Sequence, residues 1–186
     1  MTPPPVNAAW TLFLDRDGVL NRKIENGYVL NPAMLEVLNG AARAVASLAS
    51  RMGRIVIVTN QRGIARGLMG LAELEDVHAQ LRDAIAKAGG RIDGIFTCPH
   101  EKRSGCGCRK PDIGLALQAK QRFPEIDFSR SILAGDSDSD IQFGRTLGMY
   151  TVRIGPCDGD IAADLVCADL PELCDFLNEA LSGFPR

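Results

Sequence analysis

The chain has 186 residues, of which 46% are apolar and 24% are charged, and its formal net charge at pH 7 is -2. This length fits one globular domain with its own core, and the balanced charge excludes the broad basic surface of a general nucleic-acid-binding protein. No apolar run is long enough to span a membrane, and the N-terminal residues lack the pattern of a secretory signal. We therefore expect a cytoplasmic protein without a nucleic-acid or membrane partner, and the sequence is compatible with a monomer. The expected organisation is a short disordered arm over residues 1–10 and a single domain over residues 11–186.

Short apolar runs alternate along the chain with segments of helical periodicity. The predicted strands cover residues 11–14, 54–59, 94–97, 131–134, 150–154 and 165–167. The predicted helices cover residues 40–51, 71–88, 113–123, 139–147 and 170–181. Residues 19–38 contain turn signals and are expected to form an irregular flap. This alternation predicts an α/β fold, with a doubly wound, mainly parallel sheet and helices on both faces.

The end of the first predicted strand carries the segment around which the chain is organised. The apolar residues 11–14 lead into Asp15 and Asp17, and Gly18 follows at once. Side chains at positions i and i+2 of an extended chain face the same way. Two close carboxylates repel unless a cation or a proton lies between them. The pair therefore suits a divalent metal beside a nucleophile and an acid–base group. Taken alone, such a segment is more often an ordinary acidic turn.

Polar residues also follow the later strands. Thr59 and Asn60 open a glycine-containing loop whose hydroxyl, amide and backbone N–H groups suit a phosphate. Arg109 and Lys110 precede the next helix, and Asp136 follows the fourth strand. Ligands bind beyond the carboxyl ends of strands in open parallel sheets, so these side chains are expected to meet. Each one alone fits a turn, a surface pair or a helix cap, but together they supply the parts that phosphoryl transfer needs.

Three of the six cysteines lie close to a histidine. Cys98, His100, Cys106 and Cys108 fit a closed tetrahedral Zn²⁺ site in number and type, although their spacing is not that of a zinc finger. Four protein ligands leave no position for a catalytic water, so we predict a structural zinc that fixes the loop before Arg109. The alternative is a set of reduced cysteines beside a surface histidine. The other residues of these types are predicted to have no role in a site: Cys157, Cys167 and Cys174 as small apolar fillers, and His78 as a surface residue.

With these residues in view, residues 11–155 resemble the haloacid dehalogenase superfamily of phosphohydrolases. The motifs that carry the resemblance are Asp15-Arg16-Asp17-Gly18-Val19, Val58-Thr59-Asn60-Gln61, Cys108-Arg109-Lys110-Pro111 and Gly135-Asp136-Ser137-Asp138-Ser139-Asp140. The cysteine–histidine segment is similar to that of the zinc-loop subgroup, which contains heptose-bisphosphate and histidinol-phosphate phosphatases. The resemblance implies a Rossmann-like core with little or no cap domain and a small zinc-binding loop.

The resemblance also implies roles for single residues. Asp15 would attack phosphorus and form an aspartyl-phosphate, and Asp17 would protonate the leaving oxygen and then deprotonate the attacking water. Mg²⁺ would be held by the Asp15 carboxylate, the Asp17 backbone carbonyl and Asp136. Thr59 and Lys110 would hold the phosphoryl oxygens. The remaining implied roles are substrate binding by Asn60 and Arg109, and orientation of the metal shell or of Lys110 by Asp140.

The loop over residues 61–67 bears on the substrate. Its Gly-Ile-Ala-Arg-Gly run resembles the heptose branch, and Arg62 and Arg66 would attract a second phosphate and disfavour an ammonium group. Arg62 is also a departure, because the heptose enzymes usually have a small residue there. We expect a Mg²⁺-dependent phosphatase acting on a small phosphorylated sugar, first of all on the 7-phosphate of a heptose 1,7-bisphosphate. The alternatives are histidinol phosphate and a broader range of small phosphate monoesters.

Other classes of protein lack support in the sequence. A binding module that had lost its chemistry would show a gap in the catalytic set, and none is visible. A dinucleotide-binding oxidoreductase would need a Gly-x-Gly-x-x-Gly segment after a strand, and a kinase would need a Gly-Lys-Ser/Thr phosphate loop. Neither pattern is present.

Overall fold

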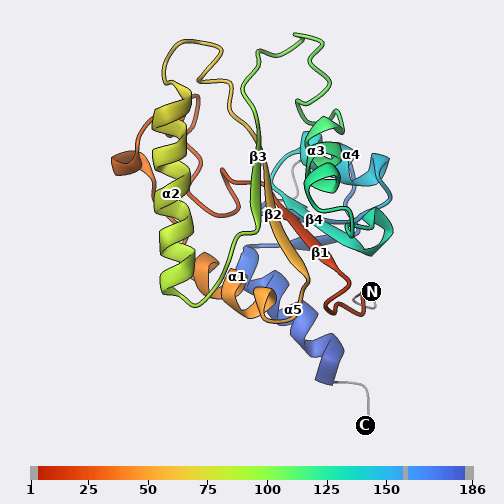
Figure 1. Cartoon of the computed structure of the whole chain (residues 1–186). Coiled ribbons are helices and arrows are strands. Elements are labelled where there is room, and N and C mark those ends of the chain that lie inside the picture. Colours follow the sequence, from red (N-terminus) through yellow and green to blue (C-terminus); the bar gives the residue numbers. More distant parts are fainter. Residues whose placement is uncertain (1–3, 157–158, 183–186) are drawn as a thin grey trace.

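The computed structural model describes residues 4–156 and 159–182, with side chains up to residue 178. In this part of the chain, six strands form one parallel sheet in the order β3-β2-β1-β4-β5-β6 (Figure 1). The strands are β1 (Thr11–Leu14), β2 (Arg54–Asn60), β3 (Gly94–Cys98), β4 (Ser131–Gly135), β5 (Tyr150–Ile154) and β6 (Leu165–Cys167). The helices are α1 (Ala41–Ala49), α2 (Leu71–Lys87), α3 (Gly114–Arg122), α4 (Asp138–Thr146) and α5 (Leu170–Ser182), with short 3-10 turns at Pro32–Met34 and Phe128–Arg130. Every predicted strand and helix is present, with ends within two residues of the prediction.

The alternation of side chains along the strands builds a separate core on each face of the sheet. Leu12 and Leu14 pack into a cluster with residues of α1, α2 and α5. Phe13, between them, packs into a second cluster with residues of α3 and α4. Figure 1 shows these two groups of helices on opposite sides of the sheet. The strands are thus covered on both faces, which explains their continuous apolar runs and confirms the predicted doubly wound fold.

Two predictions about the periphery are wrong. Val6 is only 3% exposed and packs into the core cluster, so the chain from this residue onward is not a disordered arm; residues 1–3 lie outside the described part. His78 is also only 3% exposed, because it lies on the side of α2 that faces the protein. Cys167 and Cys174 are buried as predicted, whereas Cys157 lies outside the described residues.

Two long connections lie beyond the carboxyl ends of β1, in the middle of the sheet, and of β3, at its edge. Residues 15–40, between β1 and α1, form turns, one 3-10 turn and isolated bridges that join Asn21 to Asp17 and to Val37. Residues 99–113, between β3 and α3, form an irregular loop. None of the helices in the described ranges has the length and apolarity needed to cross a lipid bilayer.

Candidate active site

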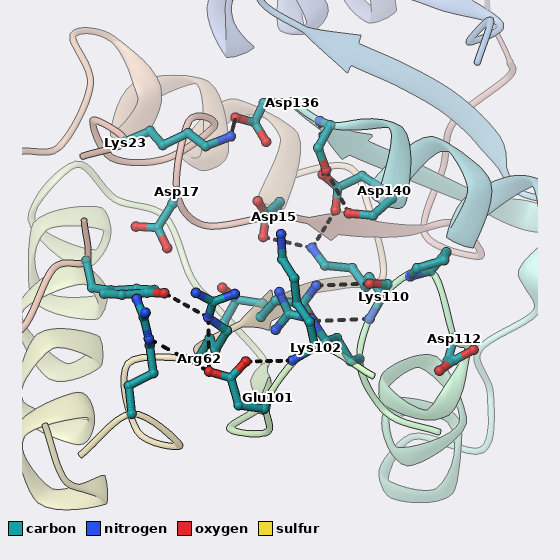
Figure 2. A pocket seen from close by; sticks show the side chains of 18 of the residues that line it. Asp15, Asp17, Lys23, Arg62, Glu101, Lys102, Lys110, Asp112, Asp136 and Asp140 are labelled. Carbon is teal, nitrogen blue, oxygen red and sulfur yellow. Dashed lines mark hydrogen bonds and ion pairs between the residues drawn. The ribbon is translucent and has the colours of Figure 1, made fainter. Parts of the chain in front are cut away.

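The order of the strands brings the predicted motifs together at one edge of the sheet. β3, β2, β1 and β4 are neighbours, so the loops after them open onto one cleft of about 770 Å³, a usual size for a small-molecule site. Figure 2 shows the cleft, with Asp15, Asp17, Lys110 and Asp136 among its lining. The cleft also includes the other predicted site residues outside the metal cluster of the β3–α3 loop: Thr59, Asn60, Arg62, Arg66 and Arg109.

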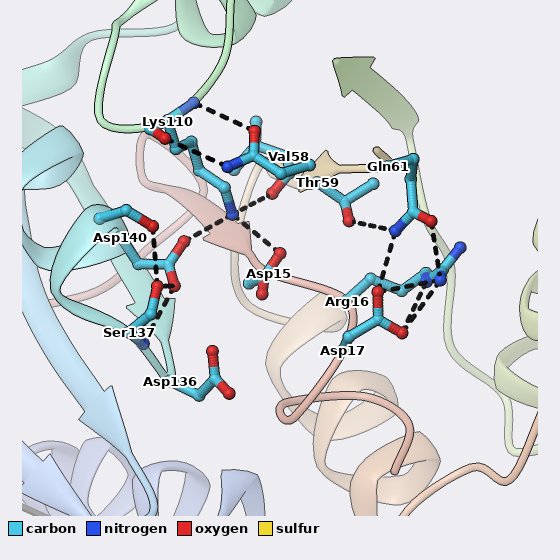
Figure 3. A network of polar contacts seen from close by, with 12 residues as sticks. Asp15, Arg16, Asp17, Val58, Thr59, Gln61, Lys110, Asp136, Ser137 and Asp140 are labelled. Carbon is cyan, nitrogen blue, oxygen red and sulfur yellow. Dashed lines mark hydrogen bonds and ion pairs between the residues drawn. The ribbon is translucent and has the colours of Figure 1, made fainter. Parts of the chain in front are cut away.

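The centre of the site is a buried lysine between two carboxylates. Lys110, which is 3% exposed, has its Nζ 2.8 Å from Asp15 Oδ1, 2.5 Å from Asp140 Oδ1 and 2.6 Å from the carbonyl oxygen of Val58 (Figure 3). An ammonium group has three N–H donors, so all of them have partners. Asp140 therefore contacts Lys110, which agrees with one of the two roles expected for it.

These contacts shift the proton affinities of both partners. Burial raises the pKa of Asp15 to about 7; Lys110 opposes this rise, and the nearby charges of Asp140 and Asp136 add to it. Burial by itself would lower the pKa of Lys110, but the charges of Asp140 and Asp15 outweigh burial and raise it above its usual range. Lys110 is therefore a permanent positive charge against the Asp15 carboxyl group.

Three carboxylates of the cleft are placed so that together they could bind a hard divalent cation. Asp15, Asp136 and Asp140 each offer one oxygen, and these oxygens lie within 4.8 Å of one another. Burial raises the pKa of Asp136, although Lys23, with its Nζ 2.6 Å from Asp136 Oδ2, opposes the rise. Few carboxylates together with water and phosphate oxygens form the usual environment of Mg²⁺, so the residues present fit this ion.

Gly18 makes the close approach of two loops possible. It has φ +92°, a conformation that residues with a side chain rarely adopt, and a Cβ atom there would overlap the carboxyl group of Asp136. The turn after β1 can therefore lie against the turn after β4 only because residue 18 is glycine.

Asp17 is oriented differently from the sequence-based expectation. Its carboxylate accepts hydrogen bonds from Arg16, Asn21 and Gln61, and Figure 3 shows it turned toward Arg16 and Gln61. The extended geometry that would point Asp15 and Asp17 the same way ends at Leu14, because the following residues form a turn. Burial opposes ionisation of Asp17, but the Arg16 guanidinium and the hydrogen bonds from Asn21 and Gln61 hold its pKa below the usual range.

Thr59 and Asn60, at the end of β2, have different contacts. The Thr59 hydroxyl, 1% exposed as a residue, accepts a hydrogen bond of 2.9 Å from the amide of Gln61. The Asn60 side chain accepts from the backbone N–H of Lys110 at 3.1 Å and donates to the backbone carbonyl of Lys110 at 3.2 Å. This pair of bonds fixes the backbone of the lysine relative to the sheet.

Two arginines of the cleft, Arg62 and Arg66, share an acidic neighbour that the sequence motifs do not include. Glu101 Oε1 lies 3.4 Å from Arg62 Nε and 3.8 Å from Arg66 Nε. Arg62 also donates to the hydroxyl of Tyr28 at 3.0 Å. Arg109 donates to the backbone carbonyl of His100 at 3.4 Å. One carboxylate faces several cations here, so this side of the cleft keeps a positive charge (Figure 2).

The loop between β3 and α3 brings the four predicted zinc ligands together. Cys98 Sγ lies 3.7 Å from Cys106 Sγ, which lies 3.4 Å from Cys108 Sγ. The His100 Nδ1 atom is 3.2 Å from Cys108 Sγ and 3.6 Å from Cys98 Sγ. Metal–ligand bonds of about 2.3 Å in a tetrahedron imply ligand separations of roughly 3.8 Å. The donor set and its spacing therefore fit a closed zinc site.

Sequence reasoning missed several residues that support this site. Arg16 and Gln61 belong to the motifs quoted above. Arg16 directly precedes Asp17 and Gln61 follows Thr59 by two residues, so their closeness in sequence to these predicted site residues could have identified them. His78, Tyr28 and Glu101 come from other loops and helices, and no spacing in the sequence connects them with the motifs.

Comparisons with known proteins agree with this geometry. The HAD-hydrolase-like family model matches residues 107–173. The D-glycero-alpha-D-manno-heptose-1,7-bisphosphate 7-phosphatase of Mycobacterium bovis is 44% identical over 160 residues, covering 83% of this chain and 84% of the relative. The corresponding beta-anomer enzyme of Bordetella bronchiseptica is 37% identical over 137 residues, covering 74% of this chain and 75% of the relative.

A solved structure gives the same result for the fold. The D,D-heptose 1,7-bisphosphate phosphatase of B. bronchiseptica, in complex with magnesium and phosphate, superposes with a TM-score of 0.85 at 32% identity and covers 91% of this chain and 98% of its own. Identity, coverage and superposition at this level are those of members of one family. The chain belongs to the haloacid dehalogenase-like family of phosphatases.

Proposed function

We propose that the protein is a Mg²⁺-dependent phosphatase that removes the 7-phosphate of D-glycero-D-manno-heptose 1,7-bisphosphate through an aspartyl-phosphate on Asp15. The observation that carries this proposal is the contact between the buried Lys110 ammonium and Asp15, at the floor of a cleft whose far side is basic. A nucleophile and a fixed cation at one point suit a phosphoryl group, and the further cations suit a second phosphate.

The reaction takes two displacements. One oxygen of the Asp15 carboxylate attacks phosphorus, and the P–O bond to the sugar breaks while Asp17 supplies a proton to the leaving oxygen. Water then attacks the aspartyl-phosphate as Asp17 accepts its proton, which releases phosphate and restores the Asp15 carboxylate. Lys110 keeps Asp15 in place and offsets its charge, and the Thr59 hydroxyl offers a hydrogen bond to the phosphoryl group.

Two metal ions complete the proposal. Asp15, Asp136 and the backbone carbonyl of Asp17 would hold Mg²⁺, which offsets the charge of the phosphoryl oxygens when bound. The four ligands in the loop after β3 would hold a structural Zn²⁺, since their spacing fits a closed tetrahedron. That ion would fix the loop that leads into Arg109 and Lys110.

The substrate assignment has support from both the cleft and the relatives. Figure 2 shows Arg62 and Glu101 on the side of the cleft away from Asp136. Arg66 also lies beside Glu101, and Arg109 lines the same cleft, so a bisphosphate can place one phosphate at Asp15 and the other among the arginines. The M. bovis relative, at 44% identity, is named for the alpha anomer, and the B. bronchiseptica relative, at 37%, for the beta anomer. We therefore propose the alpha-anomeric bisphosphate as the preferred substrate.

The test is phosphate release by the purified protein with Mg²⁺ on a set of substrates. The set comprises both anomers of the heptose 1,7-bisphosphate, the heptose 7-phosphate without the second phosphate, and histidinol phosphate. We expect the highest kcat/KM for the alpha-bisphosphate and a higher KM for the monophosphate. Faster turnover of histidinol phosphate would overturn the proposed substrate, and no release from any monoester would overturn the proposed reaction.

A further inference from the structure

Arg16 is a buried charge that the proposed reaction does not use directly. Its side chain is 0% exposed, whereas arginine is almost never fully buried without a partner. Its Nη2 atom lies 2.9 Å from Asp17 Oδ2 and 3.0 Å from Asp17 Oδ1, and its Nε lies 3.3 Å from Asp17 Oδ1. Removing an ion pair from water costs several kcal/mol unless geometry and further hydrogen bonds compensate. The contacts behind the guanidinium therefore matter.

Two uncharged side chains hold the other side of the guanidinium. Arg16 Nη1 lies 3.4 Å from His78 Nε2, and Arg16 Nη2 donates to Gln61 Oε1 at 3.1 Å. Both partners are buried, with His78 3% and Gln61 1% exposed. Burial and the neighbouring guanidinium lower the pKa of His78 to about 4, so the ring is neutral at pH 7 and Nε2 can accept. The contact joins helix α2 to the turn after β1.

The guanidinium group can only donate hydrogen bonds, and this determines the orientation of the Gln61 side-chain amide. Because arginine cannot accept a hydrogen bond, the amide oxygen must face Arg16, and the amide nitrogen must face the other way. That nitrogen donates to Asp17 Oδ2 and to Thr59 Oγ1, each at 2.9 Å. One amide thus links the proton-transfer group to the hydroxyl proposed for the phosphoryl group (Figure 3).

The hydrogen bonds from Arg16, Asn21 and Gln61 occupy the lone pairs of both oxygens of the Asp17 carboxylate. Oδ1 accepts from Asn21 Nδ2 at 2.9 Å and from Arg16, and Oδ2 accepts from Gln61 and Arg16. Each carboxylate oxygen has two lone pairs, so both oxygens are fully engaged on this side. To act as the acid, Asp17 must first carry a proton on one oxygen, which displaces one of these neutral donors, and Arg16 then remains as the anchor about which the carboxyl group turns.

We propose that Arg16 is a positioning residue for proton transfer, and that His78 and Gln61 hold it so that the Asp17 carboxylate is aimed at the leaving oxygen. This inference rests on the proposed function, in which Asp17 transfers the proton. His78 does not line the cleft, so it acts only through Arg16.

The experiment uses substrates that differ in their need for a proton. The sugar of a sugar phosphate would leave as a strongly basic alkoxide unless its oxygen is protonated, whereas p-nitrophenyl phosphate loses p-nitrophenolate, which is a stable anion. We expect His78→Leu to lower kcat/KM for the sugar phosphate, which reports the steps up to departure of the sugar, about tenfold, a fraction of the 10²–10⁴ that general acid catalysis supplies. The kcat/KM for p-nitrophenyl phosphate should stay within about twofold of the wild type, because its leaving group needs no proton and the later hydrolysis of the aspartyl-phosphate does not enter kcat/KM. His78→Gln should restore the lost activity, because its amide oxygen can accept from Arg16.

A second pair of variants tests Arg16 itself. Arg16→Lys keeps the charge but loses the fork that binds both Asp17 oxygens, and we expect a loss of about 10²-fold on the sugar phosphate and only a few-fold on the aryl phosphate. Arg91→Lys is the control, because Arg91 binds backbone carbonyls of Ala49 and Met52 away from the cleft. This variant should change the activity on either substrate only slightly, and by the same factor. Thermal unfolding of each variant shows that the compared proteins are folded.

The outcomes separate this inference from the proposed function. Equal losses of kcat/KM on both substrates, or no loss in His78→Leu, would overturn the positioning role while leaving the phosphatase assignment intact. A wild-type protein that releases phosphate from neither substrate would instead overturn the proposed function, and the inference with it.

Discussion

Lys110 Nζ lies 2.8 Å from Asp15 Oδ1, and the two residues are 95 positions apart in the chain. The contact joins the loop after β3 to the end of β1, and Asp140 at the start of α4 completes it with an ion pair of 2.5 Å. With the carbonyl oxygen of Val58 in β2, four segments of the chain thus meet at one ammonium group. Loss of the ammonium group leaves both carboxylates buried without their counter-charge, whereas loss of the Asp15 charge leaves Lys110 paired with Asp140.

Asp15→Asn should abolish turnover without unfolding the protein. An amide has no anionic oxygen with which to attack phosphorus, but it has nearly the same shape and still accepts a hydrogen bond from Lys110. We expect a loss on the order of 10⁴-fold or more, the size seen when a nucleophile is removed from other enzymes. Phosphate release and thermal unfolding are the measurements. Persisting activity in a folded variant would remove Asp15 from the nucleophile role.

Lys110→Met should damage stability as well as activity. It leaves Asp15 and Asp140 buried without their counter-charge and the carbonyl of Val58 without its donor. Removing one partner of a buried ion pair costs about 3–5 kcal/mol, and chemical denaturation measures this change. The matched control is Lys87→Met at an exposed position of α2, which should change stability by less than about 0.5 kcal/mol. Similar values for both variants would contradict the role of Lys110.

The proposed zinc site predicts a fixed metal content. The purified protein should contain about one Zn²⁺ per chain by elemental analysis. Cys98→Ser should lose most of this metal and unfold at a lower temperature, because the remaining ligands no longer close the tetrahedron. Cys174→Ser changes a buried cysteine far from the cluster and should retain the metal. Zinc-free protein prepared without a chelator would show that the four side chains do not form a metal site.

The neutral state of His78 predicts a pH dependence of stability. Its pKa is about 4 in the folded protein against 6.5 in the unfolded chain, so between these values the unfolded state binds more protons. The free energy of unfolding should therefore fall as the pH drops from about 6.5 to 4, by about 3 kcal/mol in total, and be unaffected by this residue above pH 7. Denaturation at several pH values, compared between wild type and His78→Gln, isolates this contribution. Parallel curves for the two proteins would contradict it.

The position of Glu101 predicts that it weakens the proposed binding of the second phosphate. Its carboxylate faces Arg62 and Arg66 at the surface of the cleft and is half exposed, so the pairs are weak. Glu101→Gln should free positive charge and lower KM for the bisphosphate about 1.4- to fivefold, which corresponds to the 0.2–1 kcal/mol of an exposed ion pair. KM for the monophosphate should stay nearly constant. Arg62→Gln should have the opposite effect on the bisphosphate alone.

The strands and the meeting of their carboxyl ends were predictable from sequence, because both depend on residue patterns within short segments. β2 was recognisable because Ile55 to Val58 are buried on both faces of the sheet and must be apolar throughout. The strand ends meet because parallel strands place their carboxyl ends together, so Asp15, Lys110 and Asp136 were expected in one site.

The partners of single side chains depend on how the loops turn, and this could not be predicted. Asp17 faces Arg16 because the chain leaves the strand after Leu14, and no residue pattern determines that turn. His78 lies on the buried side of α2 with Leu74, Val77, Leu81 and Ile85, so helical periodicity could have predicted its burial, but not its contact with Arg16. The pairing of Arg62 with Glu101 likewise depends on two irregular loops.

Cys108 stands two residues before Lys110 in the chain, and Asn60 fixes the lysine backbone from the opposite side. With zinc bound, the ion and the amide would act as two anchors of one short span that ends at the catalytic centre. A cell that runs short of zinc would then lose this activity even when magnesium and substrate are abundant. The supply of one trace element would thereby limit a reaction in which that element takes no chemical part.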